Sequence, residues 1–233
     1  GIFNQRGRQY HLAMRQVPDA RRTEFETLFQ AQPLVSDEIL YDIPAGGGYL
    51  TDFLPVPARV QSFEFSDGFA RENLAVRLLA LDRPWDIDQA DRIISLAGLH
   101  HAPDPIQIIG RIKNHVRPDG WLHVAEVAED SRVGVFLNGF VHAHNPQGHE
   151  GIFLPQNRSH YPSDWDISRL EILSCPWQFV SDQEMVNFCK LLFGLREDCD
   201  AALQAALYDI VGVVQTSQGP ALQWELLYMD VHC

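Results

Sequence analysis

The sequence predicts an α/β protein built on a mostly parallel, seven-stranded sheet with helices on both faces. Three observations support this fold class. Short apolar segments of strand length recur through residues 38–127, a helical pattern lies between the fourth and the fifth, and two further apolar segments near the C-terminus are joined by a turn. Short apolar strands that alternate with helices are typical of a parallel sheet covered on both faces. The C-terminal pair then adds an antiparallel hairpin.

The elements follow in order along the chain. A helix is expected over residues 18–30, because Pro18 suits a first helical turn and Phe25, Leu28 and Phe29 recur at helical spacing. A second helix, residues 106–116, has Asp104 as its cap and Pro105 at its first position, and residues 117–120 form the turn that ends it. The five strand segments are residues 38–43, 60–65, 75–81, 92–97 and 121–127.

The last third of the chain has a different organisation. A helix is expected over residues 133–143, within a segment of about residues 128–176 whose second half is rich in Pro, Asn, His and Ser. A segment of that length inside a compact domain is typical of a lid or binding loop. A capping box at residues 181–184 begins a helix that Gly194 ends. Residues 208–214 and 222–231 form the hairpin strands.

Length, charge and cysteine content exclude several classes of protein. We expect a single domain over residues 1–233, with an N-terminal helical cover (1–35) and a lid insertion (128–176). The net charge of −13 argues against a nucleic-acid scaffold, and Arg15, Arg21 and Arg22 are interpreted as the solvated face of a helix. No apolar run of about 18 residues could span a membrane, and no signal-peptide-like segment begins the chain. The four cysteines form no CxxC pair, which favours reduced thiols in a cytoplasmic protein.

A glycine-rich turn carries the first chemical indication. Asp42 ends a predicted strand, and Gly46, Gly47 and Gly48 follow it before a helical segment, so backbone N–H groups can approach a ligand. A dinucleotide site needs a third glycine where this chain has Thr51, which disfavours a nicotinamide oxidoreductase. Glu64 ends the next strand, where a carboxylate can accept both ribose hydroxyls of a nucleoside.

These segments resemble the class I S-adenosylmethionine-dependent methyltransferases, in particular the small-molecule branch called type 11. The resemblance covers about residues 40–127. LYDIPAGGGYL (40–50) is similar to the acidic-x-Gly-x-Gly-x-Gly motif, with Asp42 at the acidic position and Gly46 and Gly48 at the second and third glycines. VQSFEF (60–65) is similar to the second strand, DRIISLAGLHHAPD (91–104) to the fourth strand and its loop, and VRPDGWLHVAEV (116–127) to the turn and fifth strand.

The resemblance implies a Rossmann-like sheet, S-adenosylmethionine as cofactor and methyl transfer to an oxygen, nitrogen or carbon atom of a small organic molecule. It implies cofactor binding by Tyr10, Asp42, Ala45, Gly46, Gly48, Glu64, Phe65 and Leu96. Two positions depart from the family. Pro44 replaces the first glycine, which removes an N–H donor, and no suitable Asp follows the third strand, so adenine is assigned to backbone groups near Ala80 and Leu81. These departures leave open a catalytically inactive protein that binds the same cofactor.

Histidines at the expected mouth of the sheet are the candidates for proton transfer. His100 and His101 follow the fourth strand, and His142, His144, His149 and His160 lie in the long insertion. A side chain at the carboxyl end of a parallel strand faces the ligand crevice, and histidine titrates near neutral pH. We choose His100 and His142 as catalytic residues, although each could instead hold a loop.

Three further features of the sequence bear on metal binding, on a substrate pocket and on association with a second subunit. His142, His144, His149 and Glu150 do not have the spacing of a recognised zinc site, so no metal is expected. Aromatic residues such as Phe136 and Trp177 could line a substrate pocket or belong to the core. Apolar residues of the final strand could pair with a second subunit as a homodimer; they are Leu226, Tyr228 and Met229.

Overall fold

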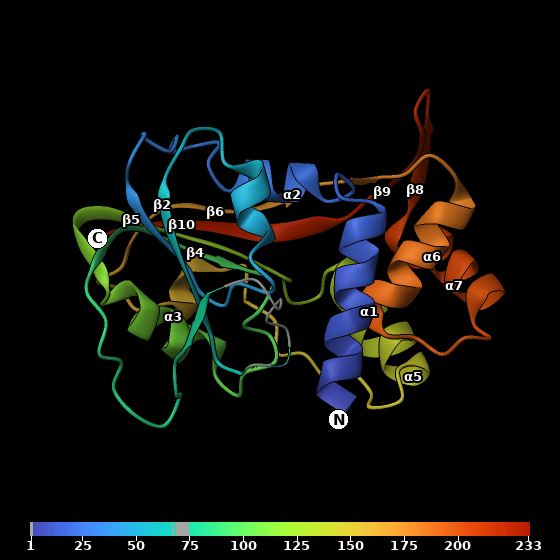
Figure 1. The fold of residues 1–233 in the computed structure, drawn as a ribbon, viewed down its shortest axis with the longest axis horizontal. Coiled ribbons are helices and arrows are strands. Elements are labelled where there is room, and N and C mark those ends of the chain that lie inside the picture. The colour runs from blue at the N-terminus through green and yellow to red at the C-terminus, as the bar shows by residue number, and fades with distance from the viewer. Residues whose placement is uncertain (1, 67, 69–74) are drawn as a thin grey trace.

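A seven-stranded sheet forms the centre of the computed structural model, which describes residues 2–66, 68 and 75–233 (Figure 1). Its strands, in spatial order, are β3 (Val76–Leu78), β2 (Arg59–Glu64), β1 (Ile39–Asp42), β4 (Ala90–Leu96), β5 (Val116–Glu126), β10 (Glu225–His232) and β6 (Asp166–Ser174). β10 runs antiparallel to both of its neighbours, and the other pairs of adjacent strands are parallel. The predicted fold class and the five early strands are therefore confirmed.

A C-terminal hairpin exists, but its strands are residues 213–216 and 219–222 instead of 208–214 and 222–231, and it belongs to a second sheet. β8 (Val213–Thr216) and β9 (Gly219–Leu222) pair with β7 (Trp177–Gln178) in a small three-stranded antiparallel sheet. Residues 208–211 are helical rather than extended, because they complete the helix α7 (Asp200–Ala206) with one wider turn, η4 (Leu207–Val211). Only β10 returns to the large sheet, and Figure 1 shows the small sheet at one end of it, beside α6 (Asp182–Phe193).

The insertion assigned to a lid contains part of the sheet. Residues 132–144 are helical, as predicted, in three consecutive pieces: α4 (Arg132–Phe136), η2 (Leu137–Val141) and α5 (His142–His144). After the short 3₁₀ helix η3 (Arg158–His160), β6 forms the edge of the large sheet beside β10. Its alternation of exposed and half-buried residues is weak, because an edge strand buries little of its surface. The sequence therefore carries little strand signal over residues 166–174.

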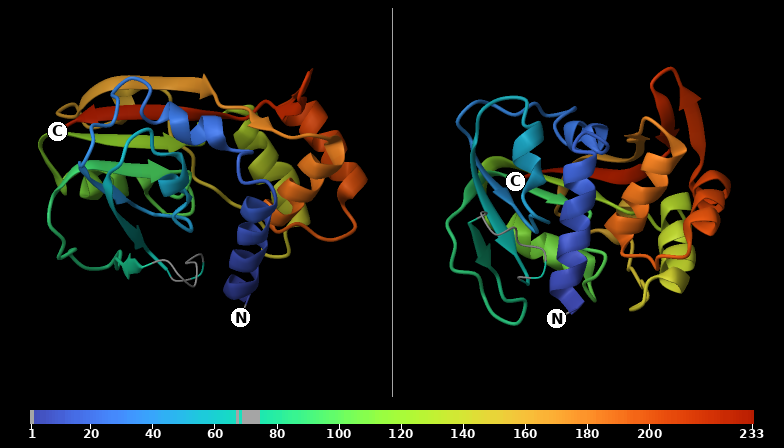
Figure 2. Two further views of the ribbon diagram at one scale, coloured as in Figure 1. Left: turned by 45° about the horizontal axis from the view of Figure 1, so that its top comes forward. Right: turned by 45° about the vertical axis from the view of Figure 1, so that its right-hand side comes forward.

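The N-terminal segment forms two helices instead of the one predicted over residues 18–30. α1 (Ile2–Gln16) ends before Pro18, which stands in a turn, and α2 (Arg22–Thr27) follows. The residue before a proline is disfavoured in helical geometry, so Pro18 separates the two helices rather than beginning one. α1 packs lengthwise against α6 (Asp182–Phe193) (Figure 2).

Alternate residues of the strands fill two cores, one on each face of the large sheet. Leu40, Ile94 and Tyr228 belong to a core shared with α1, α2 and α6, whereas Tyr41 and Ile93 belong to a core shared with α3 (Pro105–Lys113). This period of two is the geometry of a pleated strand. The predicted caps are confirmed: the Asp104 and Ser181 side chains accept backbone N–H groups of α3 and α6, and Gly194 ends α6 with a φ of 62°.

The final strand lies in the interior of the sheet, so the predicted dimer surface is wrong. Leu226, Tyr228 and Met229 are at most 1% exposed, because β5 and β6 pair with β10 on its two sides. The cysteines are free, as expected. Among the described residues, no helix combines the length and apolar character needed to cross a membrane.

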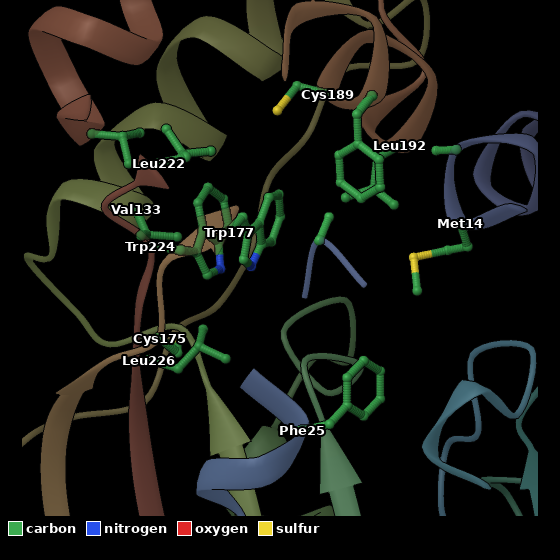
Figure 3. Close-up of a cluster of buried hydrophobic side chains, with 14 of the residues drawn as sticks. Met14, Phe25, Val133, Cys175, Trp177, Cys189, Leu192, Leu222, Trp224 and Leu226 are labelled. Atoms are coloured by element: carbon green, nitrogen blue, oxygen red, sulfur yellow. The ribbon is translucent and has the colours of Figure 1, made fainter. Parts of the chain in front are cut away.

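Two stacked indoles mark the centre of the larger core. Trp177 of β7 and Trp224 have ring centroids 4.2 Å apart and an interplanar angle of 25° (Figure 3). Trp177 is 2% exposed and also contacts Phe188 and Phe193 of α6. It therefore belongs to the core and does not line a substrate pocket.

Replacing this indole should strongly destabilise the fold. We expect Trp177→Ala to lower the free energy of unfolding by about 3–5 kcal/mol, because a buried tryptophan leaves a cavity that the surrounding side chains cannot fill. Urea unfolding followed by circular dichroism measures the change. Trp121→Ala, at a partly exposed position of β5, is the matched control and should lose clearly less; equal losses would contradict the assignment of Trp177 to the core.

Candidate functional site

A recess lies at the carboxyl ends of β1 and β4. The recess is narrow: about 30 Å³ of its interior admits a water-sized sphere, well below the range of about 300–1,000 Å³ typical of small-ligand sites. Five of the predicted cofactor residues line it: Tyr10, Asp42, Ala45, Gly46 and Leu96. Ligands of open parallel sheets bind outside the carboxyl ends of the strands, so the recess is the candidate site.

The glycine turn between β1 and the following 3₁₀ helix forms one wall of the recess. Gly46, Gly47 and Gly48 have φ values of 54°, 93° and 73°, a left-handed conformation that residues with a Cβ rarely adopt. A Cβ on Gly47 would lie 2.7 Å from the His11 ring of α1. The turn therefore requires glycine for its backbone conformation and for the close approach of α1.

The helical segment expected after this turn is short. It is the five-residue 3₁₀ helix η1 (Tyr49–Phe53), which has too few aligned peptides to bind an anion through a helix dipole. η1 packs beside α2, because the ring of Phe53 in η1 stacks on that of Phe25 in α2 with centroids 4.7 Å apart. Any ligand must therefore be held by the glycine backbone and by side chains.

Asp42 is a buried carboxyl group in the wall of the recess. It is 3% exposed, and its Oδ2 atom has no hydrogen-bond partner. Burial, together with repulsion from Glu64, raises the pKa of Asp42 well above its usual range. A buried polar atom without a partner is unfavourable, so this oxygen would be stabilised by a ligand that donates a hydrogen bond or carries positive charge.

Glu64 ends β2 and faces back toward the glycine turn. Its Oε1 atom accepts the backbone N–H of Gly46. Burial raises the pKa of Glu64 to about 7, against the opposing effect of backbone hydrogen bonds from Gly46 and Phe65. The hydrogen bond to Gly46 fixes the carboxylate beside the recess, while its other lone pairs remain available to hydroxyl groups.

A buried arginine, Arg21, completes the recess, contrary to the expectation of a solvated position. Arg21 was expected on a solvated face, but it is 6% exposed and lines the recess, whereas Arg15 and Arg22 are exposed. It forms an ion pair with Glu24 and donates a 2.8 Å hydrogen bond to the Tyr10 hydroxyl. Burial alone lowers the pKa of Arg21, but Glu24 and Tyr10 outweigh burial and raise it, so the recess holds a permanent positive charge.

Other predicted cofactor residues do not line the recess. Phe65 stacks on Trp85 with ring centroids 5.9 Å apart. The carbonyl of Ala80 accepts the Trp85 indole N–H, and that of Leu81 accepts Arg111. The carbonyl of Gly48 accepts the Thr51 hydroxyl. The assignment of adenine to backbone groups near Ala80 and Leu81 stays a prediction, and both carbonyls already have partners.

The structure brings three histidines together beyond the end of β4. His100 is 7% exposed, and its Nδ1 atom forms a hydrogen bond with Glu126, the last residue of β5. His101 and His149 lie against it, with ring centroids 4.1 Å and 5.3 Å from that of His100. Burial, followed by repulsion from His100, lowers the pKa of His101 to about 4 and that of His149 to about 3. Both imidazoles are therefore neutral at pH 7.

The second predicted catalytic histidine, His142, supports a loop. Its Nδ1 atom accepts the backbone N–H of His149 at 3.0 Å. His144 stacks on Phe140 with ring centroids 4.0 Å apart, so the set of His142, His144, His149 and Glu150 is not the group that the structure brings together. The histidines that do meet are His100, His101 and His149. The sequence signals for them are the pair His100–His101 at a strand end and the position of His149 between two glycines.

The close approach at Gly47 gives a direct test of the turn. We expect Gly47→Ala to lower the free energy of unfolding by about 1–3 kcal/mol, because the left-handed φ strains alanine and its Cβ overlaps His11. Gly139→Ala is the control: nothing lies within 4 Å of its Cβ, and alanine favours a helix by up to about 1 kcal/mol. Thermal and urea unfolding measure both variants, and an unaffected Gly47→Ala would contradict this geometry.

The raised pKa of Glu64 predicts a pH-dependent stability. The folded state favours the protonated carboxyl. The contribution of protonated Glu64 to the free energy of unfolding is therefore complete below the unfolded pKa of about 4.3 and is lost as pH rises through 7. Glu64→Gln should therefore gain stability relative to the natural protein between pH 5 and pH 8, by up to about 3 kcal/mol. Unfolding across this range measures it. Glu171→Gln, at an exposed position of β6, should show no such trend.

Comparison with solved structures supports the fold seen here. A proposed methyltransferase from Bacillus halodurans has a TM-score of 0.58 at 15% identity, over 90% of this chain and 98% of that one. A second proposed methyltransferase, in a complex with the Haloferax volcanii Trm112 methyltransferase activator, has a TM-score of 0.58 at 14% identity, over 95% of this chain and 93% of that one. Coclaurine N-methyltransferase, bound to N-methylheliamine and SAH, has a TM-score of 0.53 at 12% identity, over 91% and 70%.

Sequence comparisons add no closer similarity, since no protein-family model and no curated protein sequence matches the chain. The strand order of the large sheet, with β10 as its one antiparallel strand, indicates the same fold as these structural neighbours. The chain has the fold of the class I S-adenosylmethionine-dependent methyltransferases.

Proposed function

We propose that this protein binds S-adenosylmethionine in the recess and transfers its methyl group to an oxygen, nitrogen or carbon atom of a small organic molecule. The observation that carries the proposal is the buried carboxyl of Asp42, whose Oδ2 atom has no partner, beside three left-handed glycines at the carboxyl end of β1. The fold of the structural neighbours supports the proposal, and the side chains of this chain supply the chemical argument.

The charges in the recess fit the amino-acid end of the cofactor. An α-ammonium group carries the positive charge and the N–H donors that the Oδ2 atom of Asp42 lacks. Arg21 offers a permanent positive charge to an α-carboxylate, and the Tyr10 hydroxyl, which it holds, lies in the same wall. An ammonium group beside Asp42 and a carboxylate beside Arg21 would each meet a group of opposite charge, and two such contacts would orient a zwitterion.

The nucleoside end fits the glycine turn and the neighbouring Glu64. Glu64 can accept ribose hydroxyls while its Oε1 atom remains on Gly46, and the glycines remove the side chains that would keep a ribose away. The adenine assignment to Ala80 and Leu81 belongs to the proposal. Bound S-adenosylmethionine supplies an electrophilic methyl group on a sulfonium sulfur.

The protein has to align the acceptor in line with that methyl group and exclude competing water. His100 follows β4, whose Leu96 lines the recess, so acceptor and cofactor would meet at neighbouring positions of one sheet edge. Within residues 128–154, the loop that carries His149 lies against His100, because the N–H of Ile152 bonds the His100 carbonyl at 2.8 Å. We assign selection of the acceptor to this loop and to the helical segment α4–α5. The proposed enzyme is a single domain that acts in the cytoplasm.

Pro44 favours one alternative, a protein that binds the cofactor without methyl transfer. It stands at the first glycine position of the motif, lines the recess and lies against Gly98. Its missing N–H removes one donor that the motif would offer. Cofactor binding without turnover over a panel of amine, phenol and carboxylic acid acceptors would favour this alternative over catalysis.

Isothermal titration calorimetry with S-adenosylhomocysteine and S-adenosylmethionine tests the proposal. We expect one binding site per chain, and at least tenfold weaker binding for Asp42→Asn, because loss of the carboxylate charge removes an interaction worth about 1.5–3 kcal/mol. Asp52→Asn is the matched control, since Asp52 is exposed on η1.

The comparison of these two variants separates a specific site from general electrostatic attraction. Both remove one negative charge from a chain whose net charge is −13, but only Asp42 lines the recess. No heat with either ligand, at concentrations where nucleosides bind other proteins of this fold, would overturn the proposal. Equal weakening by Asp52→Asn would move the site away from Asp42.

A further inference from the structure

We propose that His100, His101 and His149 form a binding site for one divalent transition-metal ion of the Zn²⁺ class. One ligand nitrogen from each of the three side chains lies within 4.8 Å of the others. Tetrahedral zinc with bonds of about 2.0–2.1 Å to nitrogen separates its ligands by roughly 3.4 Å. Small rotations of the imidazoles would close that difference.

In two of the three histidines, His100 and His149, the Nδ1 atom already has a partner of the kind found in metal sites. The Nδ1 atom of His100 bonds the carboxylate of Glu126, which is fully buried, and the Nδ1 atom of His149 bonds Asn138 Oδ1 at 3.0 Å. Metal-binding histidines commonly donate their second nitrogen to a carboxylate or an amide oxygen in this way. Both bonds leave Nε2 as the atom that would face the ion.

The protein holds this arrangement with backbone contacts from two directions. Glu126 also accepts the N–H of Leu99 at 3.2 Å, so it fixes the loop that carries His100 and His101. The His149 loop is held by the 2.8 Å bond from Ile152 to the His100 carbonyl. A Cβ on Gly151 would lie 3.2 Å from the His100 ring, so glycine permits the close approach of the loop.

The chemistry of the donors selects the class of metal. Three imidazoles suit Zn²⁺ and the neighbouring ions Co²⁺, Ni²⁺ and Cu²⁺ rather than Mg²⁺ or Ca²⁺, which prefer oxygen ligands. Neutral imidazoles have the free lone pairs that binding requires. The Arg6 guanidinium lies near enough to repel a cation, but it donates to the carbonyls of Leu191 and Leu192 at the end of α6. Three protein ligands leave a fourth position for water or another ligand.

This inference reverses the expectation of no metal, and it rests on the histidine cluster rather than on the proposed methyl transfer. Sequence spacing could not identify the site, because His149 is 48 positions from His101 and enters through a loop after α5. The three rings meet only because that loop folds back onto the end of β4.

Zn²⁺ titration of the chelator-treated full chain tests the site. We expect one strong site by calorimetry, and a visible absorption band of tetrahedral Co²⁺ after addition of one equivalent. His149→Ala should weaken Zn²⁺ binding about 100-fold or more, and Glu126→Gln about 10–100-fold, because Glu126 positions His100. His160→Ala, an exposed histidine outside the cluster, should leave the affinity unchanged.

The outcomes separate this inference from the proposed function. Equal Zn²⁺ affinity in the natural protein and in His149→Ala, or no tetrahedral Co²⁺ band, would overturn the metal site. Should His149→Ala fail to fold, His101→Ala serves in its place, since His101 is the most exposed of the three. Titration of the same samples with S-adenosylhomocysteine reports on the recess independently, so metal binding without nucleoside binding would defeat only the methyl transfer proposal.

Discussion

Burial of charge at one edge of the sheet is the constraint on which the candidate site depends. Asp42, Glu64 and Arg21 are each at most 6% exposed, and charged groups are expensive to bury unless they are paired. Arg21 is paired with Glu24, and Glu64 is bonded to Gly46. Asp42 keeps an oxygen without a partner. The fold therefore provides internal partners for Arg21 and Glu64 and leaves one oxygen of Asp42 to be satisfied by a ligand.

The N-terminal helices make this burial possible. In a parallel sheet, helices between successive strands usually cover the faces, but here the helical part of the connection from β1 to β2, residues 43–58, is only the five-residue η1. α2 fills the remaining space through the stacking of Phe25 on Phe53, and the Tyr228 hydroxyl of β10 donates to the Glu24 carbonyl of α2. α1 then lies over the glycine turn through His11 and Tyr49, which share a 2.8 Å hydrogen bond. The recess is consequently enclosed by α1 and α2 together with the carboxyl ends of β1 and β4.

The features that the sequence predicted well are those with strong local signals. Five parallel strands, the caps at Asp104 and Ser181, and the glycine turn each depend on residues close together in the chain. The errors arose where distant packing decides the outcome. β6 was missed because an edge strand has weak alternation. Arg21 was placed in solvent because its burial depends on the tertiary fold, which brings Tyr10 of α1 to it; its other partner, Glu24, is local. The histidine cluster likewise needs a loop closure between His101 and His149 that no spacing rule describes.

The two candidate sites are linked by the order of the strands. β1 ends at Asp42, β4 at Leu96 and β5 at Glu126, and these three strands are consecutive in the sheet. A ligand held by Asp42 and a ligand held by the histidines would therefore bind along the same edge, because parallel neighbours bring their carboxyl ends together. Glu126 is the residue that joins them: it ends β5, holds the His100 ring and holds the backbone of Leu99, just beyond the recess. A change at Glu126 should consequently affect the histidine cluster directly, because Glu126 holds His100. It should affect the recess by two routes: through the loop after β4, and through the repulsion between Glu126 and Glu24, the partner of Arg21.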